Sequence, residues 1–384
     1  MVTHVPGEKI LKDVLREELT SGDSATRRLL IDLQDIHSAF QWERFLEHGL
    51  DAHFIARIYE LDGVERTARA SDYWRQVNYI SEFEGTLTLP RDKRGISIYS
   101  RRAFVYPQLS VRTMLPRLSL IGDEFGMRYY FGFENGGNIG NGIAAFYIYT
   151  TPITINELRV IIGTLPLPSC YLNIDVAKPS DFYYNYHLYR IVVSRNLVLF
   201  FIDSRLRAVA VQLLQGGYVK VKENVLPYSI ALIPPLPSSL TTMIQLYAGD
   251  RTSVATSDTV APLSPYWFRV SDGKEVVPLA LPLYPDNTDS AMAGRSISSG
   301  NIASHPVPLF GYSRKTIRFM ANQGGSLEIQ VYTLSGNWRT YESVSISANT
   351  LLSYSIDDEV ILARIVFTPS TYPATINEAE VSMS

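Results

Sequence analysis

The fold is decided by residues 186–205, YHLYRIVVSRNLVLFFIDSR. Within this stretch two runs rich in Val, Ile, Leu, Tyr and Phe, His187–Val193 and Leu197–Asp203, flank the short polar segment Ser194-Arg195-Asn196. Aromatic and β-branched runs of this length favour strands, and a short polar connection between two of them favours an antiparallel hairpin. The sequence therefore predicts a β-hairpin at residues 187–203.

The same pattern continues on both sides of the hairpin, over residues 79–275. In the run 127–134, Met, Tyr, Phe and Phe fall on one face of the expected strand, and Arg128, Tyr130, Gly132 and Glu134 fall on the other. Further runs of this kind are separated by Gly, Pro, Asn and Asp, and no helical pattern lies between them. A series of short strands without helices predicts a β-sandwich, here of the jelly-roll type. The other expected strands are Ile143–Tyr149, Arg159–Ile162, Tyr171–Val176, Val209–Leu214, Ser229–Ile233 and Met243–Tyr247.

Residues 1–78 have a different composition. Of the first 76 residues, 24 are charged, and Ile10, Val14 and Leu15 recur at helical spacing. Two helices over about 40 residues bury little apolar surface by themselves. We therefore expect a helical N-terminal arm that anchors the chain by packing either on its own β domains or on a neighbouring copy.

The C-terminal third divides into two parts. Residues 276–308 contain five prolines around the polar run Asp286–Ser304, which predicts a linker or extended arm. Residues 309–384 again show short alternating runs separated by Gly and Asn, which predicts a small β-sandwich. Its expected strands are Lys315–Ala321, Ser326–Tyr332, Ser343–Ser347, Leu352–Ile356 and Ile361–Thr368.

Composition excludes several classes of function. The chain has 384 residues, a net charge of −3 and one cysteine, Cys170. A single cysteine excludes an intramolecular disulfide framework and a zinc site built on several thiolates. The charge balance offers no basic surface for nucleic acid. No apolar run approaches the ~18 residues of a membrane span, the N-terminus shows no signal peptide, and no cofactor is expected.

The hairpin resembles one of the concanavalin A-like lectin/glucanase jelly rolls, in which an H-x-Y-x-I strand precedes an I-x-F-Y-V-D-G strand. Here these are His187–Val193 and Leu197–Arg205, with Val193 where the glucanases usually carry Trp and Ser204 where Gly is usual. Phe131-Gly132-Phe133 and the glycine loop after it are also similar to that fold. The resemblance covers about residues 80–273 and implies a jelly roll that belongs either to a lectin or to a glucanase.

The carboxylates that this resemblance would require for catalysis are missing from their expected place. Glucanases of this fold carry E-x-D-x-x-E on one strand, with the nucleophile and the general acid about 5.5 Å apart. Glu157 and Asp175 are isolated, and Asp123-Glu124 are neighbours that would face opposite sides of a strand. We therefore predict no catalytic residues and no enzyme, and we interpret His187 as a hydrogen-bonded residue of the sandwich.

A glycan-binding face is the alternative that the polar positions of the middle region leave open. Tyrosine presents a flat apolar ring with a polar tip, which suits both sugar stacking and subunit interfaces. The glycine loop 135–142 is either a flexible hairpin loop or a loop whose amide oxygens bind a glycan or calcium, although calcium usually requires more carboxylates. The candidate glycan-binding residues are Arg128, Tyr130, Glu134, Asn135, Asn138, Asn141, Tyr147 and Tyr149.

The whole layout is similar to virion proteins. The C-terminal runs 316–319, 325–329, 336–339 and 364–369 look like small sandwich modules of phage and archaeal-virus structural proteins and of surface proteins. This resemblance implies a non-enzymatic structural component of a virus or phage particle, located on the virion or the cell exterior. Its partners would be further copies of itself, other particle proteins and cell-surface glycans. The alternatives are a carbohydrate-binding adhesin module and a glycoside hydrolase of the lectin/glucanase fold.

Overall fold

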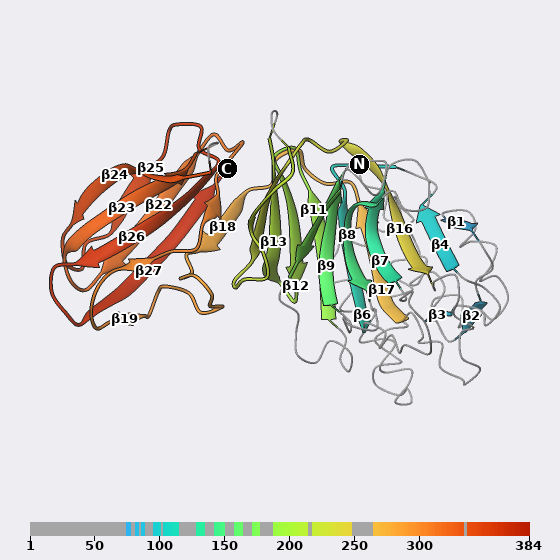
Figure 1. Cartoon of the computed structure of the whole chain (residues 1–384), viewed down its shortest axis with the longest axis horizontal. Helices are drawn as coiled ribbons and strands as arrows, with labels where there is room; N and C mark the ends of the chain where they lie inside the picture. The colour runs from blue at the N-terminus through green and yellow to red at the C-terminus, as the bar shows by residue number, and fades with distance from the viewer. Residues whose placement is uncertain are drawn as a thin grey trace, which may run out of the picture. The chain divides into compact units, whose positions relative to one another are not determined.

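The described part of the chain is built of β-strands and turns (Figure 1). The computed structural model describes residues 74–77, 81–83, 86–88, 95–100, 103–114, 128–134, 142–149, 157–163, 171–176, 187–213, 217–247, 264–333 and 336–384. These residues contain no helix, and therefore none that could cross a membrane. The expected helical arm lies outside them except for its last residues, Trp74–Val77, which form strand β1 rather than a helix. The mainly-β prediction is confirmed for the described residues.

The middle of the chain forms two large sheets. The 8-stranded sheet has the order β1-β4-β16-β7-β8-β9-β10, with β5 paired to β16, and the 7-stranded sheet has the order β14-β15-β13-β12-β11-β6-β17. The strands of the first are β1 (Trp74–Val77), β4 (Gly95–Ser100), β5 (Phe104–Val105), β7 (Arg128–Glu134), β8 (Gly142–Tyr149), β9 (Glu157–Gly163), β10 (Tyr171–Asp175) and β16 (Ser239–Tyr247). Those of the second are β6 (Gln108–Met114), β11 (His187–Val193), β12 (Leu197–Ile202), β13 (Arg205–Gln212), β14 (Val219–Lys222), β15 (Ser229–Ile233) and β17 (Ser264–Ser271). A separate hairpin joins β2 (Ser81–Phe83) to β3 (Thr86–Thr88).

The connections between the two sheets are nested. Early in the chain, β4 enters the 8-stranded sheet and β6 enters the 7-stranded sheet. Later, β16 pairs with β4 and β17 pairs with β6. The predicted hairpin is confirmed, because β11 and β12 pair antiparallel with Val193 opposite Val198. This return of late strands beside early ones in both sheets is jelly-roll connectivity.

Aromatic side chains hold the two sheets together. Phe131 and Phe146 of the 8-stranded sheet contact Tyr189 of the 7-stranded sheet with ring centroids 5.5 and 5.2 Å apart. Phe200 packs edge-on against Phe146 at 5.4 Å. All four rings are fully buried. Edge-to-face contacts of buried rings add to the hydrophobic stabilisation that comes from removing them from water.

The 7-stranded sheet is also covered on its outer face. In β12, Phe200 faces the 8-stranded sheet, whereas Leu197 and Leu199 belong to a buried cluster that includes C-terminal residues. The same division holds for the neighbouring strands, where Val209 and Ile230 are members of that cluster. Strands buried on both faces have continuous rather than alternating apolar sequences. This double burial explains the uninterrupted apolar run at residues 197–202.

The C-terminal residues form a second sandwich of two 5-stranded sheets. One has the order β18-β27-β22-β25 with β19 paired to β27, and the other has the order β20-β26-β23-β24 with β21 paired to β26. The strands of the first are β18 (Leu279–Pro282), β19 (Ser296–Ile297), β22 (Lys315–Ala321), β25 (Leu352–Ser355) and β27 (Ala374–Met383). Those of the second are β20 (Ile302–Ala303), β21 (Val307–Pro308), β23 (Gly325–Tyr332), β24 (Trp338–Ile346) and β26 (Leu362–Pro369).

The segment expected to be a linker is part of this sandwich. Four short strands, β18 to β21, lie within residues 276–308 and pair with β26 or β27. Two of its prolines, Pro282 and Pro308, end short strands that pair on one side only, which is where a sheet tolerates a residue without an N–H. The composition resembles that of a linker because short edge strands need little apolar sequence.

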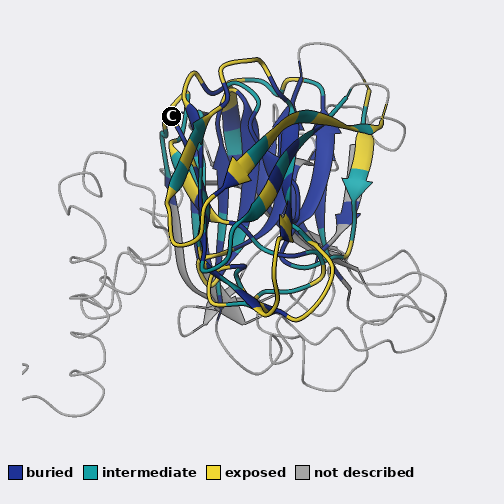
Figure 2. Cartoon of the chain, turned by 90° about the vertical axis from the view of Figure 1, so that its left-hand side faces the viewer, coloured by how far each residue is buried: buried dark blue, intermediate teal, exposed yellow. Residues whose placement is uncertain are grey.

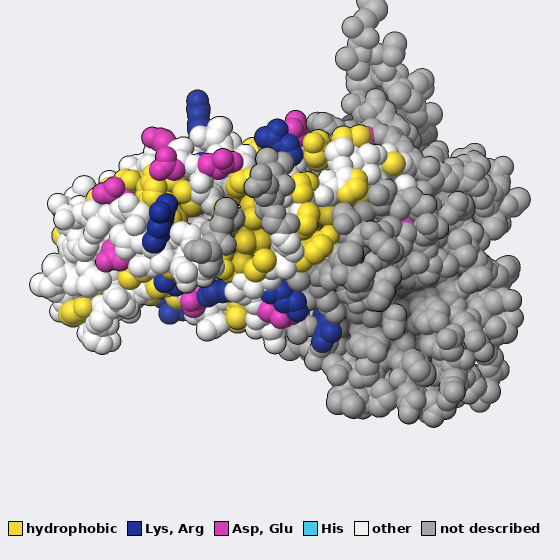
Figure 3. Space-filling view, turned by 45° about the horizontal axis from the view of Figure 1, so that its top comes forward, with side chains coloured by type: hydrophobic (Ala, Val, Ile, Leu, Met, Phe, Trp, Pro, Cys, Tyr) yellow, Lys and Arg dark blue, Asp and Glu magenta, His cyan; other side chains and the backbone are white. Residues whose placement is uncertain are grey.

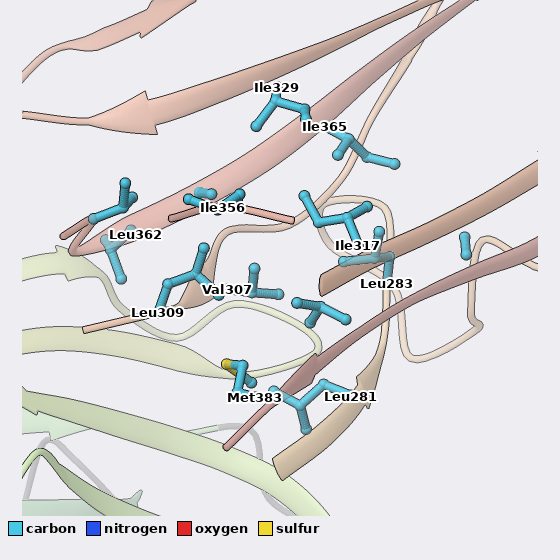
Figure 4. Packing of buried hydrophobic residues seen from close by; sticks show 14 of the residues in the cluster. Leu281, Leu283, Val307, Leu309, Ile317, Ile329, Ile356, Leu362, Ile365 and Met383 are labelled. Carbon is cyan, nitrogen blue, oxygen red and sulfur yellow. The ribbon is translucent and has the colours of Figure 1, made fainter. Parts of the chain in front are cut away.

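A common apolar cluster joins the C-terminal sandwich to the 7-stranded sheet. Leu281, Leu309 and Met383 lie in this cluster together with side chains of β12, β13 and β15. Figure 4 shows the C-terminal members of the cluster beside the green strands of the 7-stranded sheet. Figure 2 shows the strands with buried residues in dark blue and exposed residues, in yellow, on the outer strands and turns. The cluster makes the C-terminal sandwich a third layer over the jelly roll.

Hydrogen bonds fix the position of this layer. Asn196 donates from Nδ2 to the carbonyl of Phe310 at 2.9 Å. Gly311 has φ of +77°, and a Cβ added there would lie 2.5 Å from the Cβ of Asn196, so both the backbone conformation and the close approach require glycine. Arg207 donates from Nη1 to both carboxylate oxygens of Asp289 at 3.0 Å.

A polar cluster that includes the buried side chains of His305 and Tyr228 completes the contact. Asp286 Oδ1 accepts hydrogen bonds from Lys222 at 2.6 Å and from His305 Nδ1 at 3.1 Å. The ring of His305 packs edge-on against Tyr228, whose hydroxyl donates to the carbonyl of Pro306. Burial raises the pKa of Asp286, but the hydrogen bonds from His305 and Lys222 outweigh it and lower this pKa to about 2. Burial lowers the pKa of His305, against the opposing hydrogen bond to Asp286.

We predict that Leu199→Ala destabilises the chain by about 2–5 kcal/mol, the range found for fully buried leucines. Leu199 is 1% exposed on the outer face of the 7-stranded sheet, so the substitution opens a cavity beneath the C-terminal sandwich. Chemical denaturation measures the change. Val219→Ala, at a strand position that is 43% exposed, is the control and should change stability by less than about 0.5 kcal/mol. Equal losses of stability in the two variants would contradict the burial of this outer face by the C-terminal sandwich.

A second prediction concerns pH. The folded state favours neutral His305, so its contribution to stability is complete above the ordinary pKa of 6.5 and is lost as the pH falls through the lower folded-state pKa. Asp286 loses its contribution only below its ordinary pKa of 3.8. We therefore expect the free energy of unfolding to fall more steeply below pH 6.5 in the wild-type chain than in His305→Gln. Urea titrations between pH 7.5 and 5 measure how the free energy of unfolding depends on pH in both proteins. Identical slopes would refute the lowered pKa of His305 in the folded state.

Candidate functional site

The structure describes the sequence-predicted glycan residues only in part. Strand register places Arg128 opposite Tyr149 and Tyr130 opposite Tyr147 on β7 and β8. The two strands therefore bring four of the candidates to neighbouring backbone positions in the 8-stranded sheet. The glycine loop with Asn135, Asn138 and Asn141 lies outside the described residues. Glycan binding by this face stays a prediction.

Glu134 is the one of these candidates whose side chain the structure describes. It is fully buried at the end of β7, and its Oε1 accepts a hydrogen bond from the hydroxyl of Thr241 at 3.0 Å. Its carboxylate is therefore buried in the described structure. The isolated carboxylates Glu157 and Asp175 lie on two other strands, β9 and β10.

His187 and Asp203 connect the ends of the hairpin strands β11 and β12. The Nδ1 of buried His187 lies 2.5 Å from Oδ2 of Asp203. The other carboxylate oxygen of Asp203 accepts a hydrogen bond from the backbone N–H of Leu188 at 2.9 Å, and the Asp203 N–H donates to the Leu188 carbonyl. This arrangement agrees with the interpretation of His187 as a hydrogen-bonded residue of the sandwich.

Asp203 and Ser204 form the two-residue turn that follows. Their φ angles are +49° and +65°, so the turn between β12 and β13 has both central residues in the left-handed region, as in a type I′ turn. The glucanase hairpins that this one resembles usually carry Gly at the position of Ser204. A non-glycine residue in the left-handed region costs about 1–2 kcal/mol.

A groove that the sequence did not reveal lies where the C-terminal sandwich meets the end of β13 of the jelly roll. We call it the Tyr341 groove; its volume is about 580 Å³. Its buried lining residues are apolar and form its floor, and the aromatic and charged lining residues are more exposed and form its rim. Figure 3 shows one face of the chain on which hydrophobic side chains gather between acidic and basic ones. The groove is lined by Leu213, Phe310, Val331, Tyr332, Thr333, Arg339, Tyr341, Asp358, Glu359, Val360 and Ile361.

A β-bulge places Tyr341 in this groove. Thr340 pairs with Gln330 and Glu342 pairs with Ile329, so Tyr341 is the extra residue of β24 with no partner on β23. A bulge bends its strand and redirects the side chain of the extra residue. The Tyr341 hydroxyl donates to Asp358 Oδ2 at 2.8 Å, and this hydrogen bond raises the pKa of Tyr341 to about 12.

Hydrogen bonds from and to the buried Lys315 fix the turn that carries Asp358 and Glu359. Lys315, which is 4% exposed, donates from Nζ to the backbone carbonyl of Asp358 at 2.8 Å. The N–H of Ile356 donates to the Lys315 carbonyl. These bonds keep the turn between β25 and β26 in place, so that the side chains of Asp358 and Glu359 stay at the groove. Within the described residues no group of three or more His, Cys, Asp or Glu side chains is arranged to hold a metal ion.

Comparison with known proteins identifies similar solved structures but no family. No family model and no curated protein matches the chain. The β-glucanase of Bacillus licheniformis is 12% identical with a TM-score of 0.31, over 52% of this chain and 92% of that one. The carbohydrate recognition domain of Emp47p is 11% identical (TM-score 0.33, 53% and 89% covered), and a legume lectin-like domain from Entamoeba histolytica is 8% identical (TM-score 0.33, 53% and 92% covered). Because these neighbours include both glucanases and lectins, they do not separate catalysis from binding.

We predict that Ser204→Gly leaves stability unchanged or raises it by up to about 1 kcal/mol. The substitution relieves the left-handed conformation of Ser204, and the greater flexibility of glycine in the unfolded chain offsets about 0.5–1 kcal/mol of that gain. Thermal or urea unfolding measures it. Ser204→Val provides the opposite control, since a β-branched residue is disfavoured at positive φ and should destabilise the turn. A clear loss of stability in Ser204→Gly would contradict the strained turn.

Proposed function

We propose that this chain binds carbohydrate in the Tyr341 groove. The observation that carries the proposal is the combination, in one groove, of an apolar floor, two tyrosines and charged groups that can hydrogen-bond a ligand. Sugars present apolar C–H faces and polar hydroxyl edges. Aromatic rings can stack on the C–H faces of a sugar. A few polar groups at fixed positions around an apolar floor can hydrogen-bond its hydroxyls and so orient it.

The charged groups of the rim are available to a ligand. Arg339 and Glu359 form no ion pair with each other or with any other described residue. Arg339 offers only donors, and the carboxylates of Asp358 and Glu359 offer only acceptors at neutral pH. A neutral sugar hydroxyl can donate to a carboxylate and accept from a guanidinium, so a neutral saccharide can use both sides of the groove.

Tyr341 links the two kinds of contact. With a pKa of about 12, its hydroxyl stays protonated at physiological pH and continues to donate to Asp358. The hydrogen bond fixes the direction of the ring, so little side-chain freedom remains to be lost when a ligand stacks on it. Tyr341 therefore serves both as a stacking surface and as the residue that holds Asp358.

This proposal agrees with the sequence-based alternative of a carbohydrate-binding module, but it places the site in the C-terminal sandwich instead of the jelly roll. The role in a virus or phage particle, with the N-terminal arm as its anchor, stays a prediction, because nothing in the described residues bears on it.

The experiment is calorimetric titration of the full chain with a panel of neutral oligosaccharides, including glucans, mannans and galactans. We expect one or more to bind and Tyr341→Ala to weaken that binding about tenfold, since a lost ring contact of about 1.4 kcal/mol corresponds to that factor. Tyr341→Phe keeps the ring but loses the hydrogen bond to Asp358. Its affinity for the oligosaccharide should lie between those of the wild type and Tyr341→Ala.

Tyr372→Ala is the matched control. Tyr372 is likewise a tyrosine of the C-terminal sandwich whose hydroxyl donates a hydrogen bond. It is exposed, it donates to the Gly300 carbonyl, and it does not line the groove. Its replacement should leave the affinity unchanged. The proposal is overturned if no oligosaccharide binds, or if Tyr341→Ala and Tyr372→Ala bind equally well.

A further inference from the structure

A second aromatic surface adjoins the Tyr341 groove. Trp338, the first residue of β24, lies opposite Tyr332 of β23, and the two ring centroids are 5.3 Å apart. The guanidinium of Arg364 lies over the Trp338 ring at 4.5 Å from its centroid. We call Tyr332, Trp338 and Arg364 the Trp338 platform.

The platform lies on the outer face of its sheet. Along β23, Leu327, Ile329 and Val331 are buried in the sandwich, so the alternate residues, which end in Tyr332, face outward. Arg364 and Trp338 share this face, because both contact residues on it. Tyr332 also lines the groove, and it is therefore the residue at which the groove and the outer face meet.

The Trp338 platform is preorganised. Arg364 Nε donates to Gln330 Oε1 at 2.8 Å, and Gln330 Nε2 donates to Glu328 Oε2 at 3.1 Å. This chain of hydrogen bonds holds the guanidinium over one side of the Trp338 ring. A ring fixed in this way loses little conformational entropy on binding a ligand. In addition, Tyr332 lines the groove and pairs directly with Trp338, so the groove and the platform share this residue.

We propose that the binding site continues from the Tyr341 groove across Tyr332 onto the Trp338 platform, and that its ligand is a linear oligosaccharide of several neutral units rather than a monosaccharide. This inference rests on the proposed function of the groove. The groove takes one part of the oligosaccharide, and the units that follow stack on the outer face.

The test is calorimetric titration of the full chain with a length series of the neutral oligosaccharide that binds, from one unit to six. Wild-type affinity should rise with length, by about tenfold or more from the shortest to the longest ligand. Trp338→Ala should remove this rise and leave the affinity for the shortest ligand unchanged. Tyr341→Ala should weaken binding at every length, and Tyr372→Ala should bind as the wild type does.

A second measurement uses the wild-type sequence, in case Trp338→Ala does not fold. The chain has four tryptophans, so 5-fluorotryptophan labelling gives four fluorine signals, and Trp338→Phe identifies the one from Trp338. This signal should shift with the six-unit ligand and stay in place with the one-unit ligand.

The outcomes separate the two proposals. If no saccharide of any length binds, the proposed function itself fails. If saccharides bind with an affinity that does not depend on length, or if the Trp338 signal does not move with the longest ligand, the groove stands and its extension onto the platform is refuted.

Discussion

The outer face of the 7-stranded sheet carries apolar side chains that would be exposed to water unless another layer covered them. Leu197, Leu199 and Val209 are buried in one cluster with side chains of the C-terminal sandwich. Removing apolar surface from water is the dominant favourable term in folding, at roughly 25 cal/mol per Å². The burial of this face therefore makes the jelly roll and the C-terminal sandwich parts of one structure.

This contact also produces the groove. Leu213 follows the last residue of β13 and lines the groove. Phe310, which also lines it, lies just after the short strand β21, and its carbonyl accepts the hydrogen bond from Asn196. One of these lining residues therefore comes from the jelly roll and the other from the C-terminal sandwich. Two polar contacts at the junction, Asn196 with Phe310 and Arg207 with Asp289, set the position of the sandwich. They therefore also set the shape of the groove. A groove at such a junction depends on tertiary contact more than on any local motif.

Much of the strand pattern was predictable, because alternation and short polar turns are local properties. The strands at 187–193 and 315–321 lie within the predicted limits. The last strand, β27, was missed because several of its positions that are not buried carry Asn and Glu, which are uncommon in strands, although Ile376 and Val381 are buried. Strands β18 to β21 were missed because prolines and serines suggest a linker, and only their pairing partners make them strands.

The sequence by itself determined the β architecture, the hairpin at residues 187–203 and the polar residues available for binding, since each follows from residue type and spacing. It did not locate the Tyr341 groove. Tyr341 and Asp358 are far apart along the chain, and only a bulge in one strand and a turn held by Lys315 bring them together. Which apolar runs are buried on one face and which on both was likewise decided by the tertiary structure, because a run of apolar residues does not specify what covers it.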